Sequence, residues 1–391
     1  MSRIILLLLF GVSSILSNAQ VLSENAQISV ITLEPGTEEL FAGFGHSVFR
    51  VVDSENNIDW AYSYGTFNFE QPNFYLNYAK GYMFYSLSVS NYTDLKRVYK
   101  SLNRSIVAQV LALTQSQKQA LFDFLKNNAL PENRGYYYDY FYDNCATKIR
   151  DVIEEVLGEN FKLDPEYLDN PGLTIRQLTD SYIKEEFPWG KLGIDLCLGT
   201  PMDKVLTSRE YMFLPDYIYS ALNAAQIRDE TGWHKAVLRE NIVFESKETS
   251  AQDQLLFTPK LVFWLLFLIV LALTILQYKK GINLKALDVA LFLIVGLFGI
   301  FIGSIWLFTN HVAAANNMNI LWALPLHAVA VLFIFKKTKP TWWVWYWKVV
   351  WAGTSSLVIL WSVLPQAMNA ALIPLAMTIL MRAYMLFKFE N

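Results

Sequence analysis

The stretch that organises this chain runs from residue 136 to residue 151 and reads Tyr136-Tyr-Tyr-Asp-Tyr-Phe-Tyr-Asp-Asn-Cys145-Ala-Thr-Lys-Ile-Arg150-Asp. Its aromatic first half is rich in residues that favour strands, and it ends at Asp143 and Asn144, two side chains that cap helices well. The apolar residues that follow recur at helical spacing: Ile149, Val152, Ile153 and Val156. The pattern predicts a helix with Cys145 in its first turn.

Cys145 stands where a protein places a nucleophilic thiol. Unpaired N–H groups and the positive end of the helix dipole favour a thiolate there, so we expect a thiol pKa below its usual value of about 8.5. Free cysteines are also among the most buried residues, and a structural role for Cys145 is the alternative. A disulfide with Cys197, the only other cysteine, is a third reading for an exported chain.

The composition indicates an exported membrane protein. Hydrophobic residues make up 53% of the 391 residues and charged residues 17%, and most of the charged residues precede residue 260. A net charge of −3 provides no basic surface for phosphates, so we expect no nucleic-acid partner. Arg3, the apolar run 4–12 and the small residues before Gln20 predict a secretory signal peptide that is cut after Ala19.

A predicted hairpin carries His46. Residues 27–33, 46–53 and 58–65 read as strands, and residues 54–57 turn the chain between the second and the third. If Asp53 pairs with Ile58, opposed residue numbers sum to about 111, so His46 faces Tyr64 or Gly65 with Ser63 alongside. Asp59 then lies at the far end of the ladder. We therefore expect Tyr64 to orient the imidazole.

The remaining soluble residues predict an α+β domain. Strands are expected at 86–90 and 105–112, and helices at 37–42, 92–102 and 115–127, followed by a helical extension over 159–258. The aromatic segment 72–85 reads either as core or as the wall of an acyl cleft. None of the four histidines lies at ligand spacing with another His, Cys or carboxylate, so we expect neither a metal nor a cofactor.

Five apolar segments predict a membrane domain over residues 259–391. The segments are 261–278, 287–308, 320–335, 344–364 and 370–387. Lysines cluster in the loops 279–285 and 336–339, which the positive-inside rule assigns to the cytoplasm together with the C-terminus. The loop 309–319 then faces outward and brings His311 to the side of the soluble domain. Trp342, Trp343, Trp345 and Trp347 read as an interfacial belt, and His327 lies inside the third segment.

A histidine on a strand and a cysteine at a helix start are the arrangement of papain-like thiol chemistry. Here the histidine precedes the cysteine, as in the circularly permuted relatives of papain. The segment Gly45-His46-Ser47 resembles the histidine strand of lecithin:retinol acyltransferase-like proteins, and Asp143-Asn144-Cys145 resembles their helix start. A closer resemblance, to the family of the Lnb N-terminal periplasmic domain, rests on residues 44–46, 64–69, 141–151 and 195–199 ahead of a multi-span C-terminus.

The resemblance implies the architecture and the location. It implies a circularly permuted papain-like (NlpC/P60-like) α+β domain over 20–158, the helical periplasmic extension over 159–258, and an all-α five-helix transmembrane domain over 259–391. The protein would be a multi-pass protein of the bacterial inner membrane, with its catalytic domain in the periplasm and its C-terminus in the cytoplasm.

The resemblance also supplies the expected chemistry: an acyl chain moves from a phospholipid, through a thioester on Cys145, to the α-amine of a diacylglyceryl-cysteine lipoprotein. The alternatives are a periplasmic thiol peptidase or amidase, and a non-catalytic lipid-binding scaffold. The expected catalytic residues are Cys145, His46 and Tyr64. The expected oxyanion or substrate-binding residues are Asn144, Ser47, Tyr142, Asn68 and His311.

Overall fold

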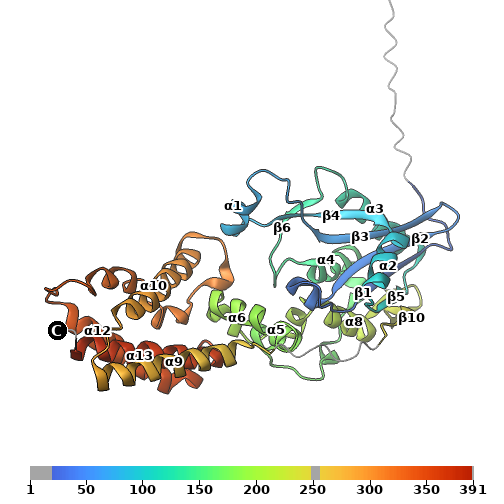
Figure 1. The fold of residues 1–391 in the computed structure, drawn as a ribbon. Coiled ribbons are helices and arrows are strands. Elements are labelled where there is room, and N and C mark those ends of the chain that lie inside the picture. The colour runs from blue at the N-terminus through green and yellow to red at the C-terminus, as the bar shows by residue number, and fades with distance from the viewer. Residues whose placement is uncertain (1–19, 248–255, 390–391) are drawn as a thin grey trace, which may run out of the picture.

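A computed structural model describes residues 20–247 and 256–389, so the predicted signal peptide lies outside the described residues. The chain forms a mixed α/β soluble part and a helical membrane part, which lie end to end with α5 (Ile175–Ile183) and α6 (Pro188–Cys197) between them (Figure 1). The soluble part therefore stands at one end of the membrane helices.

A seven-stranded antiparallel sheet forms the centre of the soluble part, with the strand order β10-β5-β1-β2-β3-β4-β6. Its strands are β1 (Gln27–Leu33), β2 (His46–Asp53), β3 (Ile58–Thr66), β4 (Phe84–Asn91), β5 (Ile106–Leu111), β6 (Gly135–Tyr137) and β10 (Val237–Phe244). Asp53 pairs with Ile58 and Phe49 pairs with Tyr62, which confirms the predicted hairpin register.

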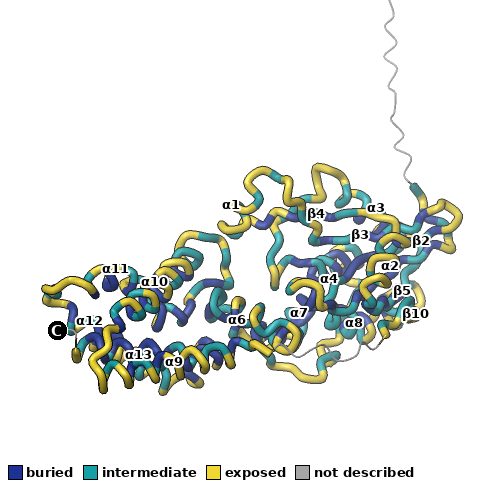
Figure 2. The backbone as a smooth tube through the Cα atoms, in the orientation of Figure 1, coloured by how far each residue is buried: buried dark blue, intermediate teal, exposed yellow. Residues whose placement is uncertain are grey.

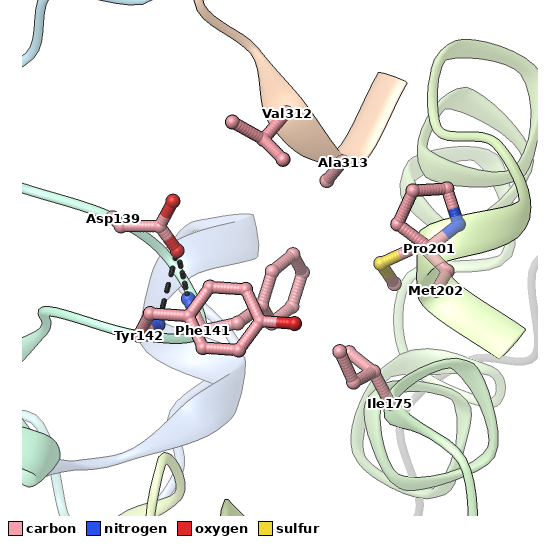
Figure 3. A pocket seen from close by; sticks show the side chains of 8 residues that line it. All are labelled: Asp139, Phe141, Tyr142, Ile175, Pro201, Met202, Val312 and Ala313. Carbon is pink, nitrogen blue, oxygen red and sulfur yellow. Dashed lines mark hydrogen bonds between the residues drawn. The ribbon is translucent and has the colours of Figure 1, made fainter. Parts of the chain in front are cut away.

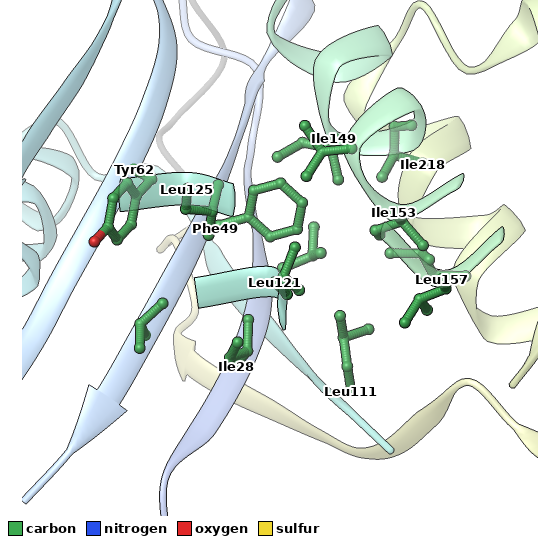
Figure 4. Packing of buried hydrophobic residues seen from close by; sticks show 14 of the residues in the cluster. Ile28, Phe49, Tyr62, Leu111, Leu121, Leu125, Ile149, Ile153, Leu157 and Ile218 are labelled. Atoms are coloured by element: carbon green, nitrogen blue, oxygen red, sulfur yellow. The ribbon is translucent and has the colours of Figure 1, made fainter. Parts of the chain in front are cut away.

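Helices cover both faces of this sheet. The soluble helices are α1 (Phe74–Ala79), α2 (Tyr92–Ser101), α3 (Gln115–Asn128), α4 (Cys145–Leu157), α5 (Ile175–Ile183), α6 (Pro188–Cys197), α7 (Ser208–Tyr211) and α8 (Pro215–Ala224). Side chains from α3, α4 and α8 share one core with alternate residues of β1, β2 and β3, and Phe49 faces Ile149 and Ile153 in Figure 4. The intervening residues, such as Val48, pack with Tyr92 of α2 on the opposite face.

Residues 159–258 are not a separate helical extension. β10 pairs with β5 and closes that edge of the main sheet, while Ile218 and Leu222 of α8 fill its core. A second sheet orders β7 (Phe161–Lys162), β8 (Gln226–Asp229) and β9 (Gly232–Lys235). The predicted domain boundary at 158 is therefore wrong, because residues on both sides of it pack into one core. Without residues 159–258, the β5 edge would be unpaired and one face of the sheet would be uncovered. The predicted helix 37–42 is a 3-10 helix, Leu40–Phe44.

The segment 175–203 docks the soluble part on the loops of the membrane part that contain Asn319 and Asn369. Asp195, which is 1% exposed, accepts hydrogen bonds from Arg176 at 2.7 Å, Lys191 at 2.6 Å and Asn369 at 2.9 Å. Its backbone carbonyl accepts a hydrogen bond from Asn319 at 2.8 Å. These contacts join α5 and α6 to two loops of the membrane part. One loop precedes the third predicted span, and the other follows the fourth.

The membrane part contains α9 (Pro259–Lys280), α10 (Lys285–Phe308), α11 (His327–Ala330), α12 (Trp343–Leu360) and α13 (Ile373–Phe389). Among the described residues, three helical segments are long and apolar enough to cross a membrane, namely 259–280, 285–308 and 370–389. The predicted third span is not one continuous helix. It consists of the 3-10 turns Met318–Leu321 and Val331–Phe333 around the short α11, because Pro325 lacks an amide donor and interrupts a helix.

The predicted tryptophan belt is only partly at the surface. Trp342 and Trp345 are exposed, whereas Trp343 and Trp347 are buried in the membrane core. Trp347 stacks on His327, whose ring also contacts the Tyr346 hydroxyl at 2.8 Å. His327 is therefore part of the packing of the helices.

Candidate active site

Cys145 is the first residue of α4, as the sequence predicts, and Asn144 caps that helix. The Asn144 side-chain oxygen accepts hydrogen bonds from the N–H groups of Ala146 at 2.8 Å and Thr147 at 2.9 Å. Its amide nitrogen donates to the carbonyls of Tyr140 and Phe213, both at 2.8 Å. The Asn144 side chain is thereby committed to holding the helix start and is not free to bind an oxyanion, which corrects the expected role.

The Cys145 thiol is free, and so is that of Cys197. Backbone N–H groups of Ser47, Ala146 and Cys145 itself interact with the Cys145 sulfur and favour the thiolate. The surrounding protein nonetheless raises the pKa of Cys145 to about 11, because the loss of hydration outweighs these three donors. The expectation of a lowered thiol pKa is therefore wrong for this state, and the thiol is neutral at pH 7.

His46 is the first residue of β2. Gly45 precedes it with φ +74°, and a Cβ on Gly45 would lie 2.8 Å from the Leu33 carbonyl oxygen, so glycine is required where the chain enters the strand. The ring Nε2 of His46 contacts the Ser63 hydroxyl at 2.8 Å. Burial lowers the pKa of His46 to about 4, with a smaller contribution from the positive charge of Arg104.

The start of β2 lies against the start of α4. The N–H of Ser47, the residue after His46, interacts with the Cys145 sulfur, so α4 begins directly against the beginning of this strand. The imidazole itself is held on Ser63. Both His46 and Cys145 are neutral at pH 7, which is the state of a base and a nucleophile before proton transfer.

Tyr64 does not orient His46. Its side chain is 3% exposed in the core, and its hydroxyl accepts a hydrogen bond from Asn128 at 3.0 Å. Successive residues of a strand point to opposite faces of the sheet, so Ser63 reaches the imidazole and Tyr64 points away. Asp59 pairs with Arg50 at 2.7 Å, at the far end of the hairpin as predicted.

Three further residues surround the thiol. Gly65 has φ +90°, and a Cβ there would lie 3.4 Å from the Tyr138 ring and 3.8 Å from the Cys145 Cβ. The Tyr136 hydroxyl lies 4.0 Å from the same point and, among the described residues, is buried without a hydrogen-bond partner. The ladder between β3 and β4 is irregular between Ser63 and Thr66, and the sequence contains no clear signal for such an irregularity.

A small pocket opens beside the loop that leads into Cys145 (Figure 3). Asp139 shapes this loop by accepting hydrogen bonds from the N–H groups of Phe141 at 2.8 Å and Tyr142 at 3.0 Å. The pocket is lined by residues of both the soluble part and the membrane part: Asp139, Phe141, Tyr142, Ile175, Pro201, Met202, Val312 and Ala313. The predicted substrate-binding residue Tyr142 therefore shares this pocket with Val312 and Ala313 in the loop 309–319 of the membrane part.

A line of aromatic rings connects the thiol to that loop. Tyr138 lies beside Cys145, and its ring centre is 5.7 Å from that of Tyr140. The Tyr140 and Tyr78 hydroxyls are 2.7 Å apart, and the Tyr78 carbonyl contacts the ring of His311 at 3.0 Å. His311 therefore lies at the membrane end of this line.

Two other predicted site residues have local roles in the structure. Asn68 is exposed, and its side chain accepts a hydrogen bond from the Glu70 N–H at 2.9 Å within a turn. The Ser47 hydroxyl is buried without a hydrogen-bond partner among the described residues, so Ser47 faces the thiol through its backbone.

Two family models match the chain. The Lnb N-terminal periplasmic domain matches residues 17–181, and the Lnb transmembrane domain matches residues 250–391. Neither a curated protein nor a solved structure matches it. The chain belongs to the Lnb-type family, with a periplasmic N-terminal domain and a C-terminal transmembrane domain in the inner membrane.

Proposed function

We propose that the protein is a membrane-bound N-acyltransferase. It moves an acyl chain from a phospholipid, through a thioester on Cys145, to the α-amine of a diacylglyceryl-cysteine lipoprotein. The observation that carries the proposal is the meeting of Cys145, at the start of α4, with the beginning of β2 next to His46. The order of His46 and Cys145 in these elements is also what a circularly permuted papain-like fold predicts.

In the first half-reaction, Cys145 attacks the ester carbonyl of the phospholipid while His46 accepts the thiol proton. The sulfur–carbon bond forms, the ester carbon–oxygen bond breaks, and His46 returns the proton to the lysophospholipid oxygen. The N–H groups of Ser47 and Cys145 are the donors for the negative carbonyl oxygen, because the Ala146 N–H is bonded to the Asn144 side chain. Because the thiol pKa is about 11 and the imidazole pKa about 4, the proton moves during the attack and no preformed ion pair is needed.

In the second half-reaction, the lipoprotein amine attacks the thioester. His46 accepts a proton from the amine and gives it to the departing sulfur, so that an amide forms and the thiol is restored. Water would compete with the amine for the thioester, and the half-buried positions of Cys145 and His46 limit its access. This exclusion of water favours acyl transfer over hydrolysis.

The route of the acyl chain follows the aromatic rings between Cys145 and the membrane part. Tyr138 and Tyr140 provide apolar faces near the thiol, and Tyr142 lines the adjoining pocket. His311 lies at the opposite end of the route and is suited to bind a lipid headgroup.

The C-terminus lies on the cytoplasmic side in this proposal. Lys279 and Lys280 end α9 at the end of the bundle farthest from the soluble part, and the ring of Tyr278 lies 6.0 Å from that of Phe389 near the C-terminus (Figure 1). A lysine-rich end opposite a periplasmic domain agrees with the positive-inside rule. A C-terminal fusion to a reporter that matures only in the cytoplasm is expected to be active.

The function is tested in cells that lack their own lipoprotein N-acyltransferase. Mass spectrometry of a lipoprotein's N-terminal peptide is expected to show an amide-linked third chain when the wild-type chain is supplied, and none with Cys145→Ala or His46→Ala. A third chain that persists in either variant would overturn the mechanism. If the wild-type protein adds no third acyl chain but releases free fatty acid or peptide fragments, it is a hydrolase instead.

A further inference from the structure

An apolar surface around α1 is left open to solvent in the soluble part. Tyr75 is 75% exposed, Phe69 58% and Leu76 52%, and no residue of α1 is buried. Phe74 lies between them, with its ring centre 5.0 Å from that of Phe69 and 5.4 Å from that of Tyr75. We call the exposed side chains of Phe69, Tyr75 and Leu76 the α1 surface. Contiguous exposed apolar groups of this kind mark an interaction site.

The α1 surface is tied to the end of a membrane-spanning helix. The N–H of Asn310 donates to the Lys80 carbonyl at 2.8 Å, and the ring of His311 contacts the Tyr78 carbonyl at 3.0 Å. These contacts lie two and three residues beyond Phe308, the last residue of α10. In Figure 1, α1 lies at the end of the soluble part nearest the membrane helices.

Other exposed apolar groups lie where membrane-spanning helices begin or end on the side of the soluble part. Phe308 and Val312 are exposed at the outward end of α10, and Leu256 and Phe257 are exposed just before α9 begins. Trp189 of α6 donates its indole N–H to the Phe257 carbonyl at 2.7 Å. Aromatic and apolar side chains at the ends of spanning helices lie at the boundary between headgroups and acyl chains. In Figure 2 the segment at α1 is coloured yellow, as exposed, and lies at the end of the soluble part that faces the membrane helices.

We propose that the α1 surface lies in the outer leaflet of the membrane that α9, α10 and α13 cross. Phe69, Tyr75 and Leu76 then contact the acyl chains just below the headgroups, as an interfacial element does. The occupant is the lipid bilayer itself, because the Asn310 and His311 contacts fix α1 at the level where α10 leaves the membrane. This placement does not depend on the chemistry at Cys145. If the proposed acyl transfer holds, the line of aromatic rings from Tyr78 to Tyr138 begins in the lipid bilayer.

The test uses the full chain in nanodiscs of phosphatidylethanolamine and phosphatidylglycerol. In a Cys145→Ala, Cys197→Ala background, Leu76→Cys carries a fluorescent label, and a nitroxide-bearing phospholipid is the quencher. Glu55→Cys is the matched control, because Glu55 is exposed in the turn between β2 and β3 at the end of that hairpin opposite His46. Lipid nitroxide is expected to quench the label at residue 76 at least about twofold more than the label at residue 55.

Equal quenching at residues 76 and 55 would overturn the proposal. A label at residue 76 that a water-soluble nitroxide quenches freely, and that only an added lipoprotein shields, would instead identify a protein-docking surface. A second label at Tyr75→Cys guards against a local effect of one substitution and is expected to behave like the label at residue 76. Because the variants lack Cys145, the readout is independent of catalysis, and failure of the acyltransferase proposal would leave it interpretable.

Discussion

The two cysteines occupy opposite ends of helices, and this difference separates a reactive position from a structural one. Cys145 begins α4, where three backbone N–H groups interact with its sulfur. Cys197 ends α6, where a helix presents carbonyl groups. Burial raises the pKa of both thiols, but the donors that oppose the rise act only on Cys145. Burial alone therefore does not distinguish them, whereas the direction of the helix does.

Their surroundings differ in the same sense. Near Cys197, the carbonyls of Leu196 and Leu198 accept hydrogen bonds from Asn317 and Gln366 of the membrane loops. The segment 195–199 thus serves to dock the two parts of the chain. Near Cys145, the Tyr136 hydroxyl is left without a partner among the described residues, and the imidazole of His46 is held by a single hydroxyl. Uncommitted polar groups are what a reaction requires.

The largest expected effect separates the two thiols directly. With a radiolabelled phospholipid in nanodiscs, Cys145→Ser is expected to lower hydroxylamine-sensitive acylation of the protein at least about a thousandfold, because the nucleophile is weakened and an oxygen ester forms in place of the thioester. The matched variant Cys197→Ser is expected to stay within about twofold of wild type. Equal losses in the two variants would remove the distinction between the cysteines.

The docking role of the Cys197 region predicts an effect on stability. Arg176 is buried between Asp195 and Asp203, so Arg176→Ala takes the guanidinium from two carboxylates and leaves the buried Asp195 with Lys191 as its remaining cation. The change is expected to lower the free energy of unfolding by about 3–5 kcal/mol. Arg97→Ala, which removes an exposed pair with Asp94, is expected to cost less than about 1 kcal/mol. Thermal unfolding of the purified chain measures both. An unchanged stability combined with lost acyl transfer would make Arg176 part of the site.

The raised thiol pKa predicts how Cys145 responds to pH. In the Cys197→Ser chain without substrate, the thiolate fraction below a pKa of about 11 grows tenfold per pH unit, so alkylation by iodoacetamide is expected to rise about a hundredfold between pH 7 and pH 9. His46→Ala should leave this slope unchanged, because the imidazole is neutral above its pKa of about 4. A rate that is flat across this range and falls in His46→Ala would indicate a preformed thiolate–imidazolium pair.

The smallest expected effect concerns the group that positions His46. Ser63→Ala removes the hydroxyl at the imidazole and is expected to lower kcat for acyl transfer about tenfold with KM unchanged, while Ser63→Thr restores most of it. Tyr64→Phe is the control, because it removes a hydroxyl of the same strand that bonds Asn128. It is expected to reduce stability slightly and leave kcat within about twofold. The reverse pattern would return the orienting role to Tyr64.

Much of the local structure followed from the sequence. Alternating apolar residues predicted β1 and β2 and the register of the hairpin with β3, and the capping residues predicted the starts of α3 and α4. The sequence therefore predicted that His46 begins a strand and that Cys145 begins a helix. These features depend on side chains that are close in sequence, where spacing and backbone preference decide the outcome.

Only the tertiary structure decided which groups face one another. It put Ser63 rather than Tyr64 on His46, because an irregular ladder and the alternation of a strand determine the face. It raised the pKa of Cys145, because desolvation depends on everything packed around the sulfur and not on the helix start alone. It also joined β10 to β5 across more than a hundred residues. Helix starts and hairpins are local, and the sequence by itself determined them; burial, docking and the choice between neighbouring side chains depend on residues distant in the chain, and only the folded molecule contains them.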